Sequence, residues 1–247
     1  MDGVIADFAS AYRDVEERLF GRASSRAEPP EVEAAAEEAA AEEAAAEEAA
    51  AAVEGTAEGA AQAAGAAQTP ADVPFYEQRR RRDAIWAAIH DMPDFWTTLK
   101  PLDPRAVARI HEMMLRLGWE VFFITQRPAT AGDTAQRQTQ RWLQAQGFDL
   151  PSVLVIAGSR GTAAAAVRLD YLVDDTPQNC LDVAADSQAT PILIVPARDM
   201  TIEKSAARLN IIVLRSVGEA LDLLEKASAE RARPSLLRRF SNLLRRS

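Results

Sequence analysis

The feature that most restricts how this chain can fold is a series of short, almost wholly apolar runs in its second half. The clearest, Val121-Phe122-Phe123-Ile124-Thr125, carries apolar side chains on both faces of an extended segment. Such runs are typical of parallel sheets, because helices cover both faces of those sheets. We therefore expect five strands, at 121–125, 153–156, 171–173, 192–195 and 211–214.

Segments with helical periodicity accompany these strands. Asp103 and Pro104 suit the N-cap and the first position of a helix, and Gly118 suits its end. The side chains expected to face inward on this helix are Val107, Ile110, Met114, Leu115 and Leu117. Further helices are expected at 133–146, 162–168, 178–186 and 216–228. The alternation predicts an α/β fold with a doubly wound, Rossmann-like parallel sheet and right-handed crossovers.

The first part of the chain contains a low-complexity segment. A helix is expected at 9–21, ended by Gly21, and ordered structure is expected again from about Pro74. Between them, residues 31–54 repeat the unit AAAEE. A period of five residues winds the Glu pairs around a helix, so no coherent apolar face remains. The segment is interpreted as a solvated helix or a disordered spacer, and 55–74 as linker.

Charge and composition narrow the class of protein. Residues 28–58 contain eleven Glu and no Lys or Arg, and without them the net charge changes from −9 to +2. Overall charge therefore does not suggest a nucleic-acid partner. The single cysteine, Cys180, is compatible with a reducing compartment. Neither a secretory signal nor an apolar run of ~20 residues occurs, so we expect a cytoplasmic protein.

The tail, residues 230–247, differs from the rest in composition. From Arg231 onward it has six Arg and no acidic residue. Its apolar residues follow helical spacing: Leu236, Leu237, Phe240, Leu243 and Leu244. A basic amphipathic helix at 234–246 could bind an anionic membrane surface or a partner protein, which would make the protein peripheral to the membrane. Packing of the same helix on its own domain is an equally favoured interpretation.

Polar residues follow three of the expected strands. Asp174 and Asp175 are adjacent carboxylates at the end of one strand, where they repel each other unless a cation binds. Mg²⁺, which prefers oxygen ligands, fits this pair, although either Asp could instead cap the following helix. Thr125 ends another strand, and Arg127, two residues on, could reach a substrate phosphate. Arg160 stands in Gly-Ser-Arg-Gly-Thr before a helix, after the strand at 153–156.

These residues and the opening MDGVIADF resemble the four motifs of the haloacid dehalogenase-like phosphohydrolases. The resemblance covers residues 1–20 and about 84–225. DFWTTLKPLD, FFITQRP and a helix containing Trp-Leu are most similar to the 5′(3′)-deoxyribonucleotidase branch. The first motif of the family is a strand that ends in Asp-x-Asp-Gly, whose first Asp is the nucleophile. Asp2 matches the second Asp, and Met1 stands at the x position, so the nucleophile has no counterpart in this sequence.

The resemblance implies a role for each residue. Asp2 would be the general acid/base, and its backbone carbonyl a Mg²⁺ ligand together with Asp174 and Asp175. Thr125 would donate a hydrogen bond to the phosphoryl group, and Arg160 would neutralise charge. Gln126 and Arg127 would bind substrate. The cofactor would be Mg²⁺, and the substrate a small phosphorylated molecule such as a nucleotide.

The resemblance also implies a domain organisation. Residues 1–8 and 101–229 would form the core, and residues 9–100 a helical cap enlarged by the insertion at about 28–72. The strand that precedes Asp2 in the family lies between the Thr125 and Asp174 strands. We expect that the chain is truncated at its start, and that the sheet without this strand exposes an apolar slot.

Two functions follow as expectations. The first is a Mg²⁺-dependent phosphomonoester hydrolase that works through an aspartyl-phosphate and is inactive without the missing Asp. The alternative is a catalytically inactive protein that binds phosphoryl compounds, or an adaptor that uses the acidic spacer and the basic tail.

Overall fold

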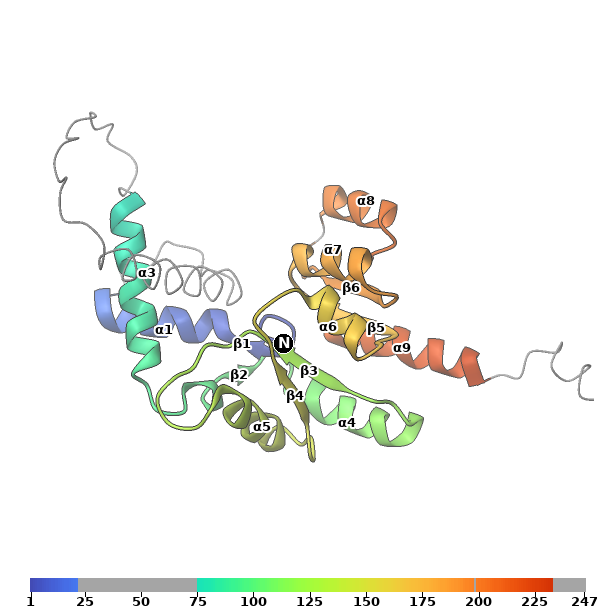
Figure 1. The fold of residues 1–247 in the computed structure, drawn as a ribbon, viewed down its shortest axis with the longest axis horizontal. Coiled ribbons are helices and arrows are strands. Elements are labelled where there is room, and N and C mark those ends of the chain that lie inside the picture. The colour runs from blue at the N-terminus through green and yellow to red at the C-terminus, as the bar shows by residue number, and fades with distance from the viewer. Residues whose placement is uncertain (22–74, 198, 233–247) are drawn as a thin grey trace, which may run out of the picture.

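The computed structural model describes residues 1–21, 75–197 and 199–232. Within these ranges helices alternate with parallel strands, so the chain has an α/β fold (Figure 1). The insertion expected at about 28–72 and the helix expected at 234–246 lie outside the described residues.

The parallel strands form two separate sheets. In one sheet β3 (Phe122–Thr125) pairs with β4 (Ser152–Val155). In the other, β6 (Thr190–Ile194) lies between β5 (Tyr171–Asp174) and β7 (Ile212–Leu214). Each of the five expected strands is present within two residues of its predicted bounds, because an apolar run in this fold is buried from both faces.

β3 and β5 each have one unpaired edge. In the part of the chain that the structure describes, β3 pairs only with β4, and β5 only with β6. The N-terminal segment does not lie between them as a strand. Instead, β1 (Ala6–Asp7) pairs antiparallel with β2 (Lys100–Pro101), outside both parallel sheets.

Helices cover and connect the sheets. They are α4 (Ala106–Leu117), α5 (Ala135–Ala145), α6 (Arg160–Ala166), α7 (Pro177–Asp186), α8 (Met200–Arg208) and α9 (Val217–Ala232). α4, which follows β2, packs on α9, which follows β7. Arg109 donates a hydrogen bond to Asp222 at 2.6 Å, and Trp119 Nε1 donates to Ser228 Oγ at 2.9 Å. This contact joins the half of the molecule that contains β3 to the half that contains β5.

Three details of the helices differ from expectation. α4 begins at Ala106 and not at Pro104, because Asp103 Oδ1 accepts from the backbone N of Arg105 at 2.9 Å and closes a turn before the helix. Leu115 is 68 % exposed, whereas Met113 is buried, so the inward face of α4 lies closer to Val107 and Met113 than predicted. α8 was not expected at all.

A helical pair stands to one side of the sheets (Figure 1). It consists of α1 (Phe8–Phe20), which ends at Gly21 as predicted, and α3 (Phe75–His90). The Phe8 ring stacks on Trp86 with centroids 5.6 Å apart, and it also contacts Trp96 in the 3-10 helix η2 (Phe95–Thr97). The largest core cluster therefore includes residues of this pair as well as residues of β3, α4 and α5.

Among the described residues, we find no helix with the length and apolar character needed to cross a membrane.

Candidate functional site

A tight turn at the N-terminus positions Asp2. The Met1 carbonyl accepts from the backbone N of Ile5 at 3.0 Å, and the Gly3 backbone N donates to the Ala6 carbonyl at 2.9 Å. Gly3 has a φ of 74°, which L side chains rarely adopt, so the turn depends on glycine. The turn brings Asp2 to the carboxyl end of β3, where Thr125 lies.

The Asp2 carboxylate is bound by the last residue of β3, Thr125, and by Arg127, which follows the strand. Arg127 Nε lies 3.1 and 3.0 Å from the two carboxylate oxygens, and Arg127 Nη2 lies 2.5 Å from Oδ1. Thr125 Oγ1 donates to Oδ2 at 3.3 Å. The Arg127 side chain is fully buried, and that of Asp2 is 10 % exposed. Three residues predicted from sequence as site residues are therefore in contact.

Electrostatics keep the Asp2 carboxyl ionised. Burial acts to raise its pKa, since desolvation penalises the charged form. The charge and hydrogen bonds of Arg127 act in the other direction, and together with two smaller effects they bring the pKa of Asp2 below its ordinary value. The N-terminal ammonium and the Thr125 hydrogen bond lower the pKa further. Asp2 is thus a carboxylate at neutral pH.

Two residues that were not predicted from sequence fix Arg127. Arg127 Nη1 donates to Thr139 Oγ1 in α5 at 3.0 Å, and the guanidinium carbon lies 4.9 Å from the centroid of the Trp96 ring. These contacts hold the guanidinium fork in one orientation toward Asp2. No local sequence pattern marks Thr139 or Trp96, because each comes from a different element and meets Arg127 only in the fold.

Asp174 at the end of β5 serves partly as a structural residue. Its Oδ1 accepts from the backbone N of Thr176 at 2.9 Å and from Asn179 Nδ2 at 3.1 Å, which stabilises the start of α7. Its Oδ2 lies 3.8 Å from Nε of Arg160, the first residue of α6. Arg160 is 1 % exposed. The N-cap of α7 is Thr176, so neither aspartate occupies the capping position left open for the pair, and Asp174 closes a turn just before the helix.

Asp175 faces the N-terminal turn. A Cβ added to Gly3 would overlap the Asp175 carboxylate, so that carboxylate packs directly on the Gly3 backbone. Asp175 therefore lies against the turn that follows Asp2. Among the described residues, no three His, Cys, Asp or Glu side chains cluster closely enough to hold a metal.

This donor set suits Mg²⁺ better than a metal that needs an all-protein cage. Mg²⁺ prefers oxygen ligands and commonly uses one or two carboxylates, with waters and substrate phosphate completing its shell. The carboxylates of Asp174 and Asp175 and the backbone carbonyl of Asp2 are hard oxygen donors of this kind. In chemical type these donors fit Mg²⁺, with Asp174 and Asp175 as the carboxylates.

Gln126 points away from this group. Its Nε2 donates to the Gly158 carbonyl at 3.0 Å, and the residue is buried. The contact fixes the loop between β4 and α6, and so the approach to Arg160. The substrate contact predicted for Gln126 stays a prediction.

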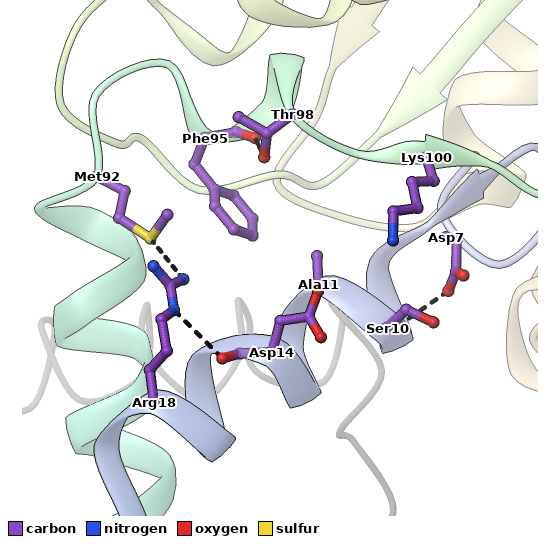
Figure 2. Close-up of a pocket in the computed structure, with 9 residues that line it drawn as sticks. All are labelled: Asp7, Ser10, Ala11, Asp14, Arg18, Met92, Phe95, Thr98 and Lys100. Atoms are coloured by element: carbon purple, nitrogen blue, oxygen red, sulfur yellow. Dashed lines mark hydrogen bonds between the residues drawn. The ribbon is translucent and has the colours of Figure 1, made fainter.

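A small pocket of about 210 Å³ lies between α1 and the segment from Met92 to Lys100 (Figure 2). Phe95 and Met92 form apolar parts of its wall, and Lys100 extends toward it from β2. Arg18 Nη2 lies 3.6 Å from the Met92 sulfur. Asp7, which also lines the pocket, accepts a hydrogen bond from the backbone N of Ser10 at 3.0 Å. The pocket combines apolar and charged groups and is joined to the Asp2 turn through β1.

Comparisons of the chain with protein-family models, with curated proteins and with solved structures find no match.

Proposed function

We propose that the chain is a Mg²⁺-dependent phosphomonoester hydrolase of the haloacid dehalogenase-like kind, with a doubly wound sheet and a helical cap. The observation that carries the proposal is the contact of Asp2 with Thr125 and Arg127 at the end of β3, with Asp175 against Gly3. An acid/base, a hydroxyl donor, a cation and a second carboxylate are what phosphoryl transfer from oxygen to water uses.

Arg127 and Thr125 are assigned to the substrate phosphate. A buried guanidinium binds phosphate oxygens through the same fork that it offers to a carboxylate. A substrate phosphate would therefore either displace Asp2 from the Arg127 guanidinium or bind the guanidinium together with Asp2. Either event weakens the interaction that lowers the pKa of Asp2, and the incoming negative charge also favours its protonated form. Substrate binding thus prepares Asp2 to donate a proton to the leaving oxygen and then to accept one from water.

Arg160 and Asp175 are assigned to charge balance. Arg160 is buried beside Asp174, where a cation offsets carboxylate repulsion at the end of β5. Asp175, the Asp2 carbonyl and Asp174 would hold Mg²⁺, which when bound neutralises phosphate charge and orients it. Gly3 leaves the room that this arrangement needs, because any side chain there would overlap Asp175.

The nucleophile is the group that residues 1–247 do not supply at the expected position, two residues before Asp2. Turnover through an aspartyl-phosphate needs a carboxylate nucleophile in addition to the residues assigned above. The same observation favours the alternative of a non-catalytic phosphoryl-compound binder. The substrate class is a small phosphorylated molecule such as a nucleotide, and the reaction suits a cytoplasmic setting.

The experiment compares the 247-residue chain with a form extended by an apolar strand that ends in Asp. Both are assayed with p-nitrophenyl phosphate and with nucleoside monophosphates, with and without Mg²⁺. Turnover only in the extended form with Mg²⁺ supports the hydrolase, and turnover by neither form favours the binder.

Metal binding is measured separately, by calorimetric titration of Mg²⁺ into each form and into single variants. Asp174→Asn and Asp175→Asn are each expected to weaken binding about tenfold or more. Asp149→Asn, which changes an exposed carboxylate away from these residues, is the matched control. Equal binding by all three variants would remove the metal assignment.

A further inference from the structure

Trp96 is fixed both at its backbone and at its indole ring. Its backbone N donates to Gln138 Oε1 at 3.0 Å, and its indole Nε1 donates to the Pro128 carbonyl at 2.9 Å. The residue is fully buried, so a bond that breaks is not replaced by one to water. The ring that these bonds orient lies 4.9 Å from the guanidinium carbon of Arg127, within the range of a cation–π contact.

Gln138 in α5 uses its whole side-chain amide in contacts of this kind. In addition to the bond from Trp96, its Oε1 accepts from Thr130 Oγ1 at 3.3 Å. Its Nε2 donates to Thr130 Oγ1 at 2.9 Å and to the Asp133 carbonyl at 2.6 Å. Gln138 is fully buried, and a buried amide with partners on both its oxygen and its nitrogen is held in one orientation. Its side chain therefore ties η2 to the segment that follows Arg127.

That segment, residues 128–133, is itself held by the end of α3. The Ala131 backbone N donates to the His90 carbonyl at 2.7 Å, and the Asp94 backbone N donates to the Ala131 carbonyl at 2.8 Å. These bonds do not involve Gln138, so the segment keeps them when the Gln138 amide is removed. Loss of the amide would therefore release η2 and its tryptophan more than the segment.

Two other glutamines of α5 contact a different part of the molecule. Gln136 Nε2 donates to the Val153 carbonyl at 3.1 Å, and Gln140 Nε2 donates to the Pro151 carbonyl at 3.4 Å. Within the described ranges, neither side chain forms a hydrogen bond with Trp96. They are the same residue type on the same helix and thus provide controls for Gln138.

We propose that Gln138 is a positioning residue for Arg127 and that it acts through the Trp96 ring. Thr139 holds one side of the guanidinium directly, by accepting from Nη1 at 3.0 Å, whereas Gln138 fixes the aromatic face on the guanidinium. A fork held in this way meets the oxygens of a carboxylate or a phosphate without first losing side-chain freedom. Gln138 thus sets how tightly Arg127 binds an anion. The effect on phosphate rests on the proposed function, whereas the effect on Arg127 itself does not.

The first measurement is the solvent exchange of the Arg127 Nε–H proton, followed by nitrogen-15 NMR in the chain without phosphate. Arg127→Lys identifies the signal by removing it. Gln138→Leu keeps the approximate volume of the side chain and removes the amide. Exchange should become about tenfold faster or more in this variant and should stay within about twofold of the parent in Gln140→Leu, the matched control.

The second measurement tests whether the effect passes through Trp96. In a chain that carries Trp96→Leu the aromatic face is absent, so the addition of Gln138→Leu should change the exchange little further, and the two substitutions should be non-additive. Trp96→Phe keeps an aromatic face and loses the bond to Pro128. It should speed exchange in the same direction, and it tests the same link if Gln138→Leu does not fold.

The affinity for inorganic phosphate, measured by calorimetry in the same chains, connects the inference to the proposed function. Binding should be about tenfold weaker in Gln138→Leu than in the parent and unchanged in Gln140→Leu. Equal exchange in these two variants, or additive effects of the Gln138 and Trp96 substitutions, would overturn the positioning role. In a parent chain that binds phosphate, equal affinity in Gln138→Leu would do the same. Faster exchange in Gln138→Leu with no phosphate binding in the parent would overturn the proposed function and support the positioning role.

Discussion

Arg127 is the residue on which the candidate site depends. It joins the N-terminal turn to β3 through Asp2, and its guanidinium is held by Thr139 and by the face of Trp96. A buried charge pair costs desolvation energy on both sides, so its net contribution to stability is small while both partners are present. The loss of one partner is a different matter, because it leaves the other charge buried and unpaired.

Arg127→Ala is therefore expected to lower the free energy of unfolding by about 3–5 kcal/mol. Arg127→Lys should fall between this variant and the parent chain, since an ammonium keeps the charge and lacks the planar fork. Arg116→Ala, which removes a half-exposed pair with Glu225, is the control and should cost less than about 1 kcal/mol. Urea denaturation of the three variants measures the difference. A loss in Arg127→Ala no larger than in the control would contradict the assignment.

The ionisation of Tyr12 in α1 is expected to make the stability of the folded chain fall at high pH. Burial, and then the charge of Glu16, raises the pKa of the Tyr12 hydroxyl from its ordinary value near 10 to about 12. Below pH 10 both the folded and the unfolded chain hold this proton. Between about pH 10 and 12 the unfolded chain loses the proton first, so stability falls as pH rises, by about 2–3 kcal/mol in total.

Unfolding by urea at pH 9, 10, 11 and 12 measures this loss, and Tyr12→Phe is the control because it cannot ionise. The difference in stability between the parent and Tyr12→Phe should shift by the stated amount over that range. Parallel pH profiles for the two chains would show that Tyr12 does not carry the effect.

Sequence identified those site residues that end or follow apolar runs. Thr125, Arg127 and Asp174 stand at strand ends, and parallel strands bring such ends together at one edge. The turn of Gly3 was also predictable, because a positive φ calls for glycine. Trp96 and Thr139 could not be found this way, since their contacts with Arg127 span 31 and 12 residues of sequence and depend on tertiary packing.

Whether a helix or strand could be predicted also depends on how its burial appears in the sequence. Strand positions were predictable because both faces of β3 and β6 are buried, which leaves a continuous apolar run in the sequence. α8 escaped prediction because Ala206 is its one fully buried side chain, so its apolar stripe is too narrow to recognise. α4 starts late because Asp103 caps a turn rather than the helix, and both uses of Asp look alike in sequence.

The contact of α6 with α7 depends on one glycine. A Cβ at Gly161 would overlap the Asp182 carbonyl group and would lie 2.8 Å from Asp186 Cβ, so the two helices approach each other through this position. Gly161→Ala should therefore force the helices apart and cost about 1–3 kcal/mol. Gly158→Ala, in the loop just before α6, meets no atom within 4 Å and is the matched control. Thermal melting compares them, and equal melting temperatures would show that α6 can shift without cost.

On the scale of the whole molecule, the described residues form two halves, and a largely apolar cavity lies between their sheets. β3, β4, α4 and α5 make one half. The three-stranded sheet of β5, β6 and β7, with α7 to α9, makes the other. The α4–α9 contact, the Asp2 turn and Arg160 connect the halves. The predicted alternation of strands and helices explains each half, whereas the gap between β3 and β5 was expected only from the resemblance of MDGVIADF to a strand-ending motif.

The attachment of the helical pair predicts how the chain tolerates a large deletion. Phe8 and Tyr12 of α1 pack on Trp86 of α3, and Ile85 and Ile89 of α3 are buried in the largest core cluster. Each of these five residues lies outside 31–70. By contrast, the AAAEE repeat at 31–54 offers no coherent apolar face to bury. Removal of residues 31–70, with 22–30 and 71–74 kept as a connection, should thus leave the melting temperature within about 2 °C of the parent.

Ile89→Ala in the full chain sets the scale for this comparison. It deletes a side chain that is wholly buried and should cost about 2–5 kcal/mol, which is several degrees of melting temperature for a protein of this size. A deletion variant that melts as low as Ile89→Ala would mean that residues 31–70 contribute to the packing of α1 and α3. A deletion variant that melts at the same temperature as the parent would mean that residues 31–70 do not stabilise α1 and α3. The aromatic and aliphatic contacts of the two helices would then be sufficient to hold them in place.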